Sequence, residues 1–284
     1  MKRHPRRGRS GLAAALVGRS THVIERHYDV WLPRGPAEAE LTIAHLSDLH
    51  IGRVTPEARL RAAVDAVNDA EPDIVCLTGD FIAHSLRYLP RLTRSLEALS
   101  APAFAVLGNH DHWHGPDEVS KALTSAGIRV LNNTSETIQV GGQPWQIVGL
   151  DDPVTGNHDL DAAFSDVSGE DGPILVLSHL AEMATEVSTR GAALVLSGHT
   201  HGGQVHVAGL THRIMTRMGH DYILGWYDAG PTGVYVNRGI GAAVFPFRSR
   251  RAQAEVACIC VRGRASEMQV SQVSGAGSPQ PLRP

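Results

Sequence analysis

Five short polar motifs follow apolar segments of this chain, and each contains side chains that bind divalent metal ions in proteins. In chain order the motifs read DLH, GDF, GNHD, SH and GHTHGG. Their imidazole nitrogens and their carboxylate and amide oxygens suit borderline to hard cations. Seven such ligands are too many for one ion, but they fit two ions that share a bridging carboxylate. The candidate ligands are Asp48, His50, Asp80, Asn109, His179, His199 and His201.

The spacing inside two motifs supports a shared cluster. Asp48 and His50 flank one residue, as do His199 and His201. On an extended chain such pairs point to the same side. Because no thiolate belongs to the set, a structural zinc site is disfavoured. Mn²⁺ is the leading candidate for the two ions, with Fe, Zn, Co and Mg as alternatives.

Strands and helices alternate along the chain, and this order predicts an α/β architecture. Short β-rich apolar runs bounded by Gly, Pro, Asn or Asp predict strands at 41–48, 72–80, 101–109, 143–151, 173–179, 192–199 and 233–239. A 3.6-residue apolar period predicts helices near 56–70, 86–99, 116–126 and 180–190. Five of the predicted strands end in candidate ligands. Because ligands in α/β sheets bind beyond the carboxyl ends of strands, we expect these side chains to converge.

A single histidine at a strand end is more often structural than a ligand, so the complete ordered set has to carry the inference. That set is similar to the signature of the calcineurin-like metallophosphoesterases, across roughly residues 40–240. The resemblance implies a four-layer α/β/β/α sandwich, with two mixed sheets face to face and helices outside. It further implies one ion on Asp48, His50, Asp80 and His201, and a second on Asp80, Asn109, His179 and His199, with Asp80 as the bridge.

Within this family, the sequence resembles the subgroup of bacterial YkuE- and YaeI-type phosphodiesterases through GHTHGGQ at 198–204, GLDD at 149–152 and NRGIG at 237–241. One relative of the subgroup cleaves the pyrophosphate of UDP-diacylglucosamine. Two positions depart from the subgroup pattern, because SHLAE lacks a proline after His179 and RSRRAQAE replaces a Pro-Pro-Glu run.

The expected chemistry is attack on phosphorus by a hydroxide that two cations generate from water at neutral pH. His110 is not a ligand in the family scheme, and we expect it to protonate the departing oxygen. Asp48 or Asp111 could orient its ring, and Asp111 is therefore counted with His110 as catalytic. His112 is a candidate substrate contact, equally well explained as an exposed loop residue. Arg238 is a candidate phosphate clamp, for which a surface salt bridge is nearly as good an explanation.

These residues predict a phosphodiesterase or pyrophosphatase acting on a small or lipid-linked phosphate ester, such as a UDP-diacylglucosamine-like nucleotide. A nuclease is disfavoured because no basic-aromatic groove is visible, so no nucleic acid partner is expected. An inactive metal-binding scaffold is disfavoured by the intact His110. The sequence does not exclude a protein phosphatase.

The formal net charge of -3 gives no general argument for nucleic acid or membrane binding. We expect three parts: a basic segment and lead-in strand at 1–39, a catalytic domain at 40–262, and a flexible tail at 263–284. An apolar run at 11–18 follows the basic start and is too short to span a bilayer. A solvated terminus is the favoured interpretation, with a signal remnant or a membrane-binding arm as alternatives. The predicted location is cytoplasmic, with peripheral contact at the inner face of the membrane if the arm binds.

Overall fold

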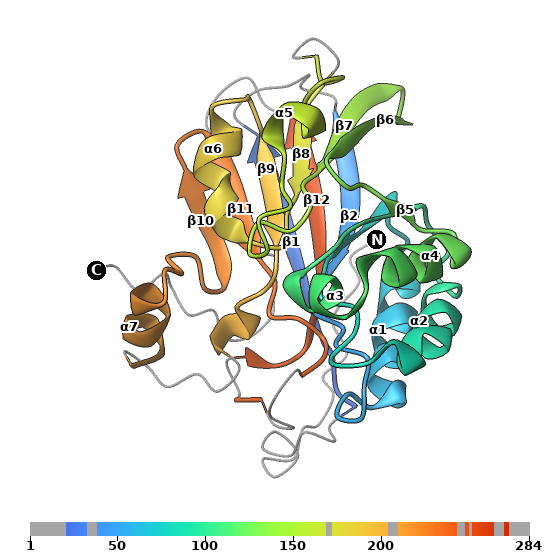
Figure 1. Cartoon of the computed structure of the whole chain (residues 1–284). Helices are drawn as coiled ribbons and strands as arrows, with labels where there is room; N and C mark the ends of the chain where they lie inside the picture. The colour runs from blue at the N-terminus through green and yellow to red at the C-terminus, as the bar shows by residue number, and fades with distance from the viewer. Residues whose placement is uncertain are drawn as a thin grey trace.

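The computed structural model describes residues 21–32, 39–168, 172–203, 210–242, 248–249, 252–263 and 270–272. Two sheets lie face to face, and helices flank them on both outer sides (Figure 1). The basic segment 1–20 and residues 273–284 lie outside the described part, so the expectations for them stay predictions.

The first sheet is mixed and has seven strands. In spatial order they are β13 (Val270–Gln272), β1 (Ile24–Leu32), β12 (Glu255–Gly263), β2 (Glu40–Leu46), β3 (Ile74–Thr78), β4 (Ala103–Val106) and β5 (Arg129–Val130). Strands β2 to β5 run parallel, and all five residues of β3 are buried. The uninterrupted apolar run of β3 suits a parallel strand that is covered on both faces.

The second sheet is also mixed and has six strands. Their order is β10 (Gly225–Ala229), β11 (Thr232–Val236), β9 (Leu194–Ser197), β8 (Ile174–Leu177), β7 (Gln143–Gly149) and β6 (Thr134–Val140). Strands β7, β8, β9 and β11 run parallel, whereas β6 and β10 are antiparallel edges. The carboxyl ends of β8 and β9 therefore lie at one edge of this sheet.

Helices form the two outer layers. On the first sheet these are α1 (Glu57–Asp69), α2 (Leu89–Leu96) and α4 (Pro116–Ser125), and on the second they are α5 (Leu160–Ala163) and α6 (Ala184–Ser188). Two further helices are α3 (Asn109–His114) and α7 (Leu210–Arg217), and the 3₁₀ turns are η2 (Leu86–Tyr88), η3 (Ala181–Met183) and η4 (His201–Gly203). Helix α1 buries Leu60, Ala63, Val64 and Val67, which share one helical face.

The central apolar layer joins the two sheets. Phe104 and Ile43 from the first sheet pack in one buried cluster with Leu175, Leu196 and Tyr235 from the second. Separate clusters lie between each sheet and its helices. The predicted four-layer α/β/β/α architecture is confirmed. No helix of the described part is both long and apolar enough to cross a membrane.

All seven predicted strands occur, with ends shifted by up to three residues. The predicted helix at 180–190 is divided into η3 and α6, and that at 86–99 into η2 and α2. The parts predicted at 1–39 and 40–262 share one sheet, because β1 pairs along its whole length with β12. Within the predicted tail, β13 pairs antiparallel with β1, because its backbone groups can bond to the edge that β1 offers.

Candidate metal centre

The loops that carry the candidate ligands follow parallel strands of both sheets. Asp48 and His50 follow β2, Asp80 follows β3, and Asn109 begins α3 after β4. In the second sheet His179 follows β8, and His199 and His201 follow β9. The predicted convergence at the carboxyl ends of the strands therefore occurs, and it takes ligands from two sheets.

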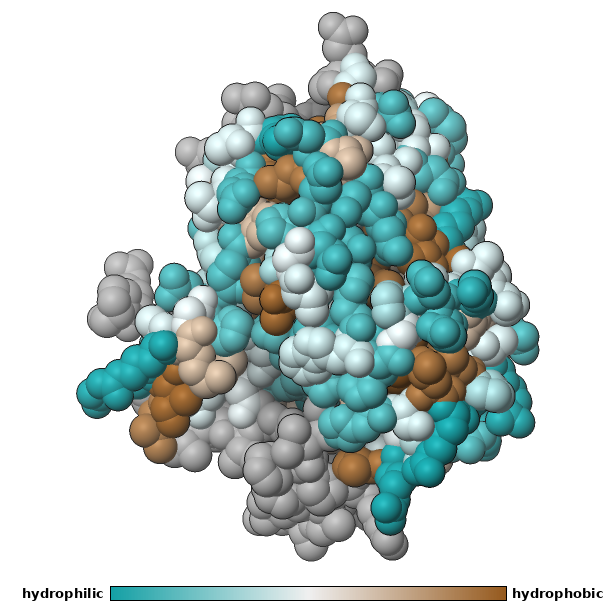
Figure 2. All heavy atoms as spheres, viewed as in Figure 1, coloured by the Kyte–Doolittle hydropathy of each residue, from teal (hydrophilic) through white to brown (hydrophobic). Residues whose placement is uncertain are grey.

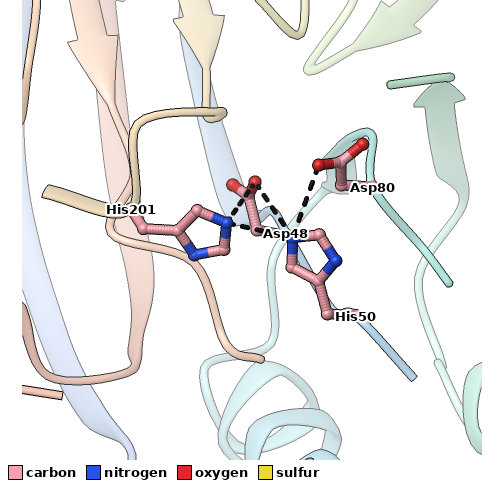
Figure 3. A group of neighbouring side chains, drawn as sticks. All are labelled: Asp48, His50, Asp80 and His201. Carbon is pink, nitrogen blue, oxygen red and sulfur yellow. Dashed lines mark hydrogen bonds and ion pairs between the residues drawn. The ribbon is translucent and has the colours of Figure 1, made fainter. Parts of the chain in front are cut away.

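Four of these side chains form a first group that could hold a metal ion: Asp48, His50, Asp80 and His201. One ligand atom from each lies within 4.8 Å of the others, and all four residues are buried. Figure 3 shows the side chains pointing toward one another from the loops after β2, β3 and β9. The Nε2 atoms of His50 and His201 are 2.9 Å apart, and Asp48 Oδ1 is 3.3 Å from His201 Nε2.

The first group also contains polar atoms whose bonding capacity a cation would satisfy. Asp48 Oδ1 is buried and accepts no hydrogen bond from the residues that the structure describes. Two imidazole nitrogens that face each other at 2.9 Å need a proton or a cation between them. Ligand atoms that bind one ion at about 2.0–2.2 Å lie roughly 3–3.5 Å apart, as several of these atoms do.

The remaining candidate ligands form a second group around the other side of Asp80. His199 Nδ1 lies 3.0 Å from Asn109 Oδ1 and 3.2 Å from His179 Nε2. Asp80 Oδ2 lies 3.4 Å from His179 Nε2 and also 3.4 Å from His50 Nε2. One carboxylate oxygen thus stands between the two groups, where a bridging ligand has to be.

The backbone of these loops is unusual. Seven non-glycine residues of the described chain have positive φ, and five of them are candidate ligands. They are Asp48 at 51°, His50 at 39°, Asp80 at 56°, His199 at 70° and His201 at 52°. A left-handed backbone costs about 1–2 kcal/mol for a residue with a Cβ atom. Strain of this kind persists where surrounding structure enforces it, and it concentrates at functional sites.

Burial sets the protonation of most of the ligands. Desolvation lowers the pKa of His50 and of His199 to about 3 and that of His201 well below its ordinary value. These imidazoles are therefore neutral at neutral pH, as metal ligands must be. Burial also lowers the pKa of His179, but the adjacent Asp80 outweighs it and raises that pKa to about 10. A metal ion at His179 consequently competes with a proton.

The comparisons with known proteins agree with this geometry. Residues 41–203, which include all seven candidate ligands, match the calcineurin-like phosphoesterase family. The chain belongs to the calcineurin-like phosphoesterases. It is 32% identical over 212 residues to the "Uncharacterized metallophosphoesterase YkuE" of Bacillus subtilis (strain 168), covering 72% of this chain and 74% of that protein. It is 30% identical over 210 residues to "Phosphodiesterase YaeI" of Escherichia coli (strain K12), covering 72% and 76%.

Among solved structures, TT1561 of Thermus thermophilus resembles this metallophosphoesterase with a TM-score of 0.48 and 16% identity, over 71% of this chain and 91% of that one. The family resemblance, including the YkuE and YaeI relatives, is confirmed. The chain is a metal-dependent hydrolase of phosphoric esters, and its family uses two metal ions.

His110 lies beside the metallophosphoesterase centre. Its ring packs edge-on against His50 with 4.7 Å between ring centroids, and its backbone N–H donates to Asp80 Oδ1 at 2.8 Å. Its Nδ1 lies 2.8 Å from the carbonyl oxygen of Ala83. This carbonyl fixes the ring, which corrects the prediction that Asp48 or Asp111 orients it.

Asp111 has a structural task in the metallophosphoesterase loop. Its Oδ1 accepts hydrogen bonds from the backbone N–H groups of Phe81 and Ile82, and its Oδ2 accepts one from Gly108. The side chain is fully buried, and burial raises its pKa to about 7, with Asp80 adding to the effect. The carboxylate therefore joins the loop after β3 to the start of α3, instead of acting on the reacting groups.

The two predicted substrate contacts are both engaged within the protein. His112 Nε2 lies 2.7 Å from Asp151 Oδ1, and its Nδ1 lies 3.3 Å from Asn157 Nδ2. Arg238 is buried, and its guanidinium pairs with Glu255 at 2.5 Å. The alternative of a salt bridge therefore describes Arg238 better than a phosphate clamp, although the bridge is buried and not on the surface.

Sequence reasoning missed Arg248. This buried side chain places one guanidinium nitrogen 2.9 Å from His201 Nδ1 and donates to the carbonyl oxygens of Arg238, Gly241 and Ala252. It thereby fixes the imidazole whose Nε2 faces the first group. The arginine-rich run RSRR was the available signal, but it identifies neither the arginine that is buried nor its partner.

Proposed function

We propose that this metallophosphoesterase hydrolyses phosphodiester or pyrophosphate bonds with two divalent ions, one held by each ligand group. The observation that carries the proposal is the position of Asp80 Oδ2, 3.4 Å from a ligand nitrogen of each group. The all-nitrogen-and-oxygen donor set favours Mn²⁺, with Fe, Zn, Co and Mg as alternatives. When bound, such a pair of ions lowers the pKa of a water molecule and neutralises the phosphoryl oxygens.

The protein's own side chains position the ligands and protonate the departing oxygen. His110 donates from Nδ1 to Ala83, so its Nε2 is the nitrogen that protonates the departing oxygen. The packing of this ring against His50 keeps it next to the ligands. Arg248 fixes the His201 ring, and Asp111 holds the loop that carries His110. In this scheme His112 contributes to the rim of the site through its pair with Asp151.

A phosphodiester is the substrate class we propose first, because the similar protein YaeI is named a phosphodiesterase. A lipid-linked nucleotide diphosphate is the finer proposal, and it rests on the subgroup resemblance alone. Nucleic acid and phosphoprotein substrates would belong to the competing nuclease and protein phosphatase functions. The four classes differ in the groups attached to phosphorus, so substrate turnover separates them.

The test is a screen of purified, Mn²⁺-loaded enzyme against bis(p-nitrophenyl) phosphate, p-nitrophenyl phosphate, UDP-diacylglucosamine, single-stranded DNA and a phosphopeptide. We expect the phosphodiester or the nucleotide diphosphate to be hydrolysed fastest and chelation to abolish turnover. Metal analysis should give close to two ions per chain, and Asp80→Asn should lower the content of both. Full activity without metal, or a preference for DNA or phosphopeptide, would overturn the proposal.

A further inference from the structure

Exposed apolar side chains gather on α7. Of the five large hydrophobic residues that the described chain exposes, three lie on α7 or directly after it: Leu210, Ile214 and Met218. Their exposed fractions are 54%, 47% and 67%. Residues four apart share one side of a helix, so the three form a continuous stripe. The other two, Trp113 and Val154, lie apart from it in sequence and from each other.

Positive charge flanks this stripe. Arg213 and Arg217 are exposed and each precedes a stripe residue by one position. Residues 210–220 contain no Asp or Glu, although the whole chain carries a net charge of -3. In Figure 2, α7 projects from the body with hydrophobic and strongly hydrophilic surfaces side by side. A helix with an apolar side and arginines beside it is typical of segments that lie at a membrane surface.

The first turn of α7 packs against a loop of the metal centre. Thr211 is buried, and its methyl group lies so close to Gly203 of η4 that a Cβ atom there would be 2.3 Å away. After the helix, the ring of His220 lies 5.0 Å from that of His199, a candidate ligand. The helix that carries the stripe therefore packs against the loop that holds His199 and His201.

The size of the helix indicates its partner. Eight helical residues span about 12 Å, whereas a stable protein interface buries roughly 800 Å² on each partner. A lipid surface needs no shaped complement, since apolar side chains enter it singly and arginines pair with its phosphates. We propose that α7 binds an anionic lipid surface through Leu210, Ile214 and Met218, with Arg213 and Arg217 on the headgroups. That this presents a lipid-borne phosphoester to the enzyme rests on the proposed function, but the binding itself does not.

The test measures co-sedimentation of full-length, Mn²⁺-loaded protein with vesicles of phosphatidylcholine and phosphatidylglycerol. The stripe variant is L210Q/I214Q/M218Q, and the charge variant is R213Q/R217Q. Their matched controls are V154Q, an exposed apolar residue elsewhere, and R61Q/R94Q, which removes two exposed charges from α1 and α2. Hydrolysis of bis(p-nitrophenyl) phosphate should stay unchanged in all four.

We expect the stripe variant to lose about tenfold in vesicle partitioning, since binding scales with the apolar area that enters the interface. The charge variant should lose binding to anionic vesicles, and both controls should bind like wild type. Equal binding by all variants would refute the proposal, as would equal losses in the controls. A dimer that dissociates in the stripe variant would also refute it, because a second copy would then cover the stripe.

Discussion

Replacing Gly79 by alanine tests how closely the backbone is packed behind the second ligand group. Gly79 has a φ of 85°, and an added Cβ would lie 2.6 Å from the backbone nitrogen of Gly108 and 2.7 Å from His179 Nδ1. Real Cβ atoms do not approach so closely, so both the Gly108 backbone and the His179 ring have to move. Movement of the ring breaks its 2.6 Å contact with the carbonyl oxygen of Thr78.

Gly127→Ala is the matched control. Its φ of 82° imposes nearly the same backbone strain, but nothing lies within 4 Å of its added Cβ. The left-handed conformation costs about 1–2 kcal/mol in each variant, which lowers Tm by about 2–8 °C in a protein of this size. Only Gly79→Ala should also lose metal, by about 10–100-fold in affinity, as for other residues that orient a ligand.

The assay separates the two effects. Thermal unfolding with chelator present gives the loss of stability, and titration with Co²⁺ followed by its visible absorption gives the affinity. If Gly79→Ala binds metal as tightly as Gly127→Ala, the close contact with His179 does not position that ligand. In that case the backbone near Gly79 accommodates a Cβ atom without displacing His179, contrary to the distances given above.

Contacts in the site lead to three more predictions. His110→Asn should retain both ions in metal analysis yet lose about 10²–10⁴-fold in kcat, because it removes a proton donor and no ligand. Arg248→Lys should weaken metal binding at the group of His201 by about 10–100-fold, seen as one altered Co²⁺ absorption band, while the other ion binds normally. The hydrogen bond to Asp151 raises the pKa of His112. The protonated His112 therefore contributes its full stability below its unfolded-state pKa of about 6.5, and this contribution is lost as pH rises through the folded-state pKa. His112→Gln should thus lower Tm at about pH 6 but not at about pH 9.

Most strands with continuous apolar runs could be predicted from the sequence, whereas the half-exposed β6 could not. β3 and β8 consist of buried residues and stand out by composition, but β6 alternates exposed and intermediate positions at the edge of its sheet. β1 and β12 lie far apart in sequence, and only their pairing explains why the polar residues of β1 lie in a sheet. Long-range pairing of this kind leaves no local pattern.

Within the site, ligand types could be predicted because metal chemistry restricts them, but supporting contacts could not. The His110 ring bonds to the backbone carbonyl oxygen of Ala83. Every residue has such a group, so the sequence does not identify this partner. Asp111 adjoins His110 in sequence, yet successive residues of a helix point about 100° apart, so it faces the backbone of Phe81 instead. Arg248 contacts a ligand 47 positions away.

The position of the ligands depends on the layer between the sheets. Asp48 and Asp80 extend from the first sheet and His201 from the second, so their distances are set by how the two sheets pack. Protein backbone already links the two sides, since His199 donates its N–H to Asp48 Oδ2 at 3.1 Å. Because a close-packed interior transmits changes of shape, we expect substitutions of residues such as Phe104 and Leu196 in the shared core to change the distances between ligands that they do not touch. Residues between a sheet and its outer helices act on one sheet at a time and leave the distances between ligands of different sheets less affected.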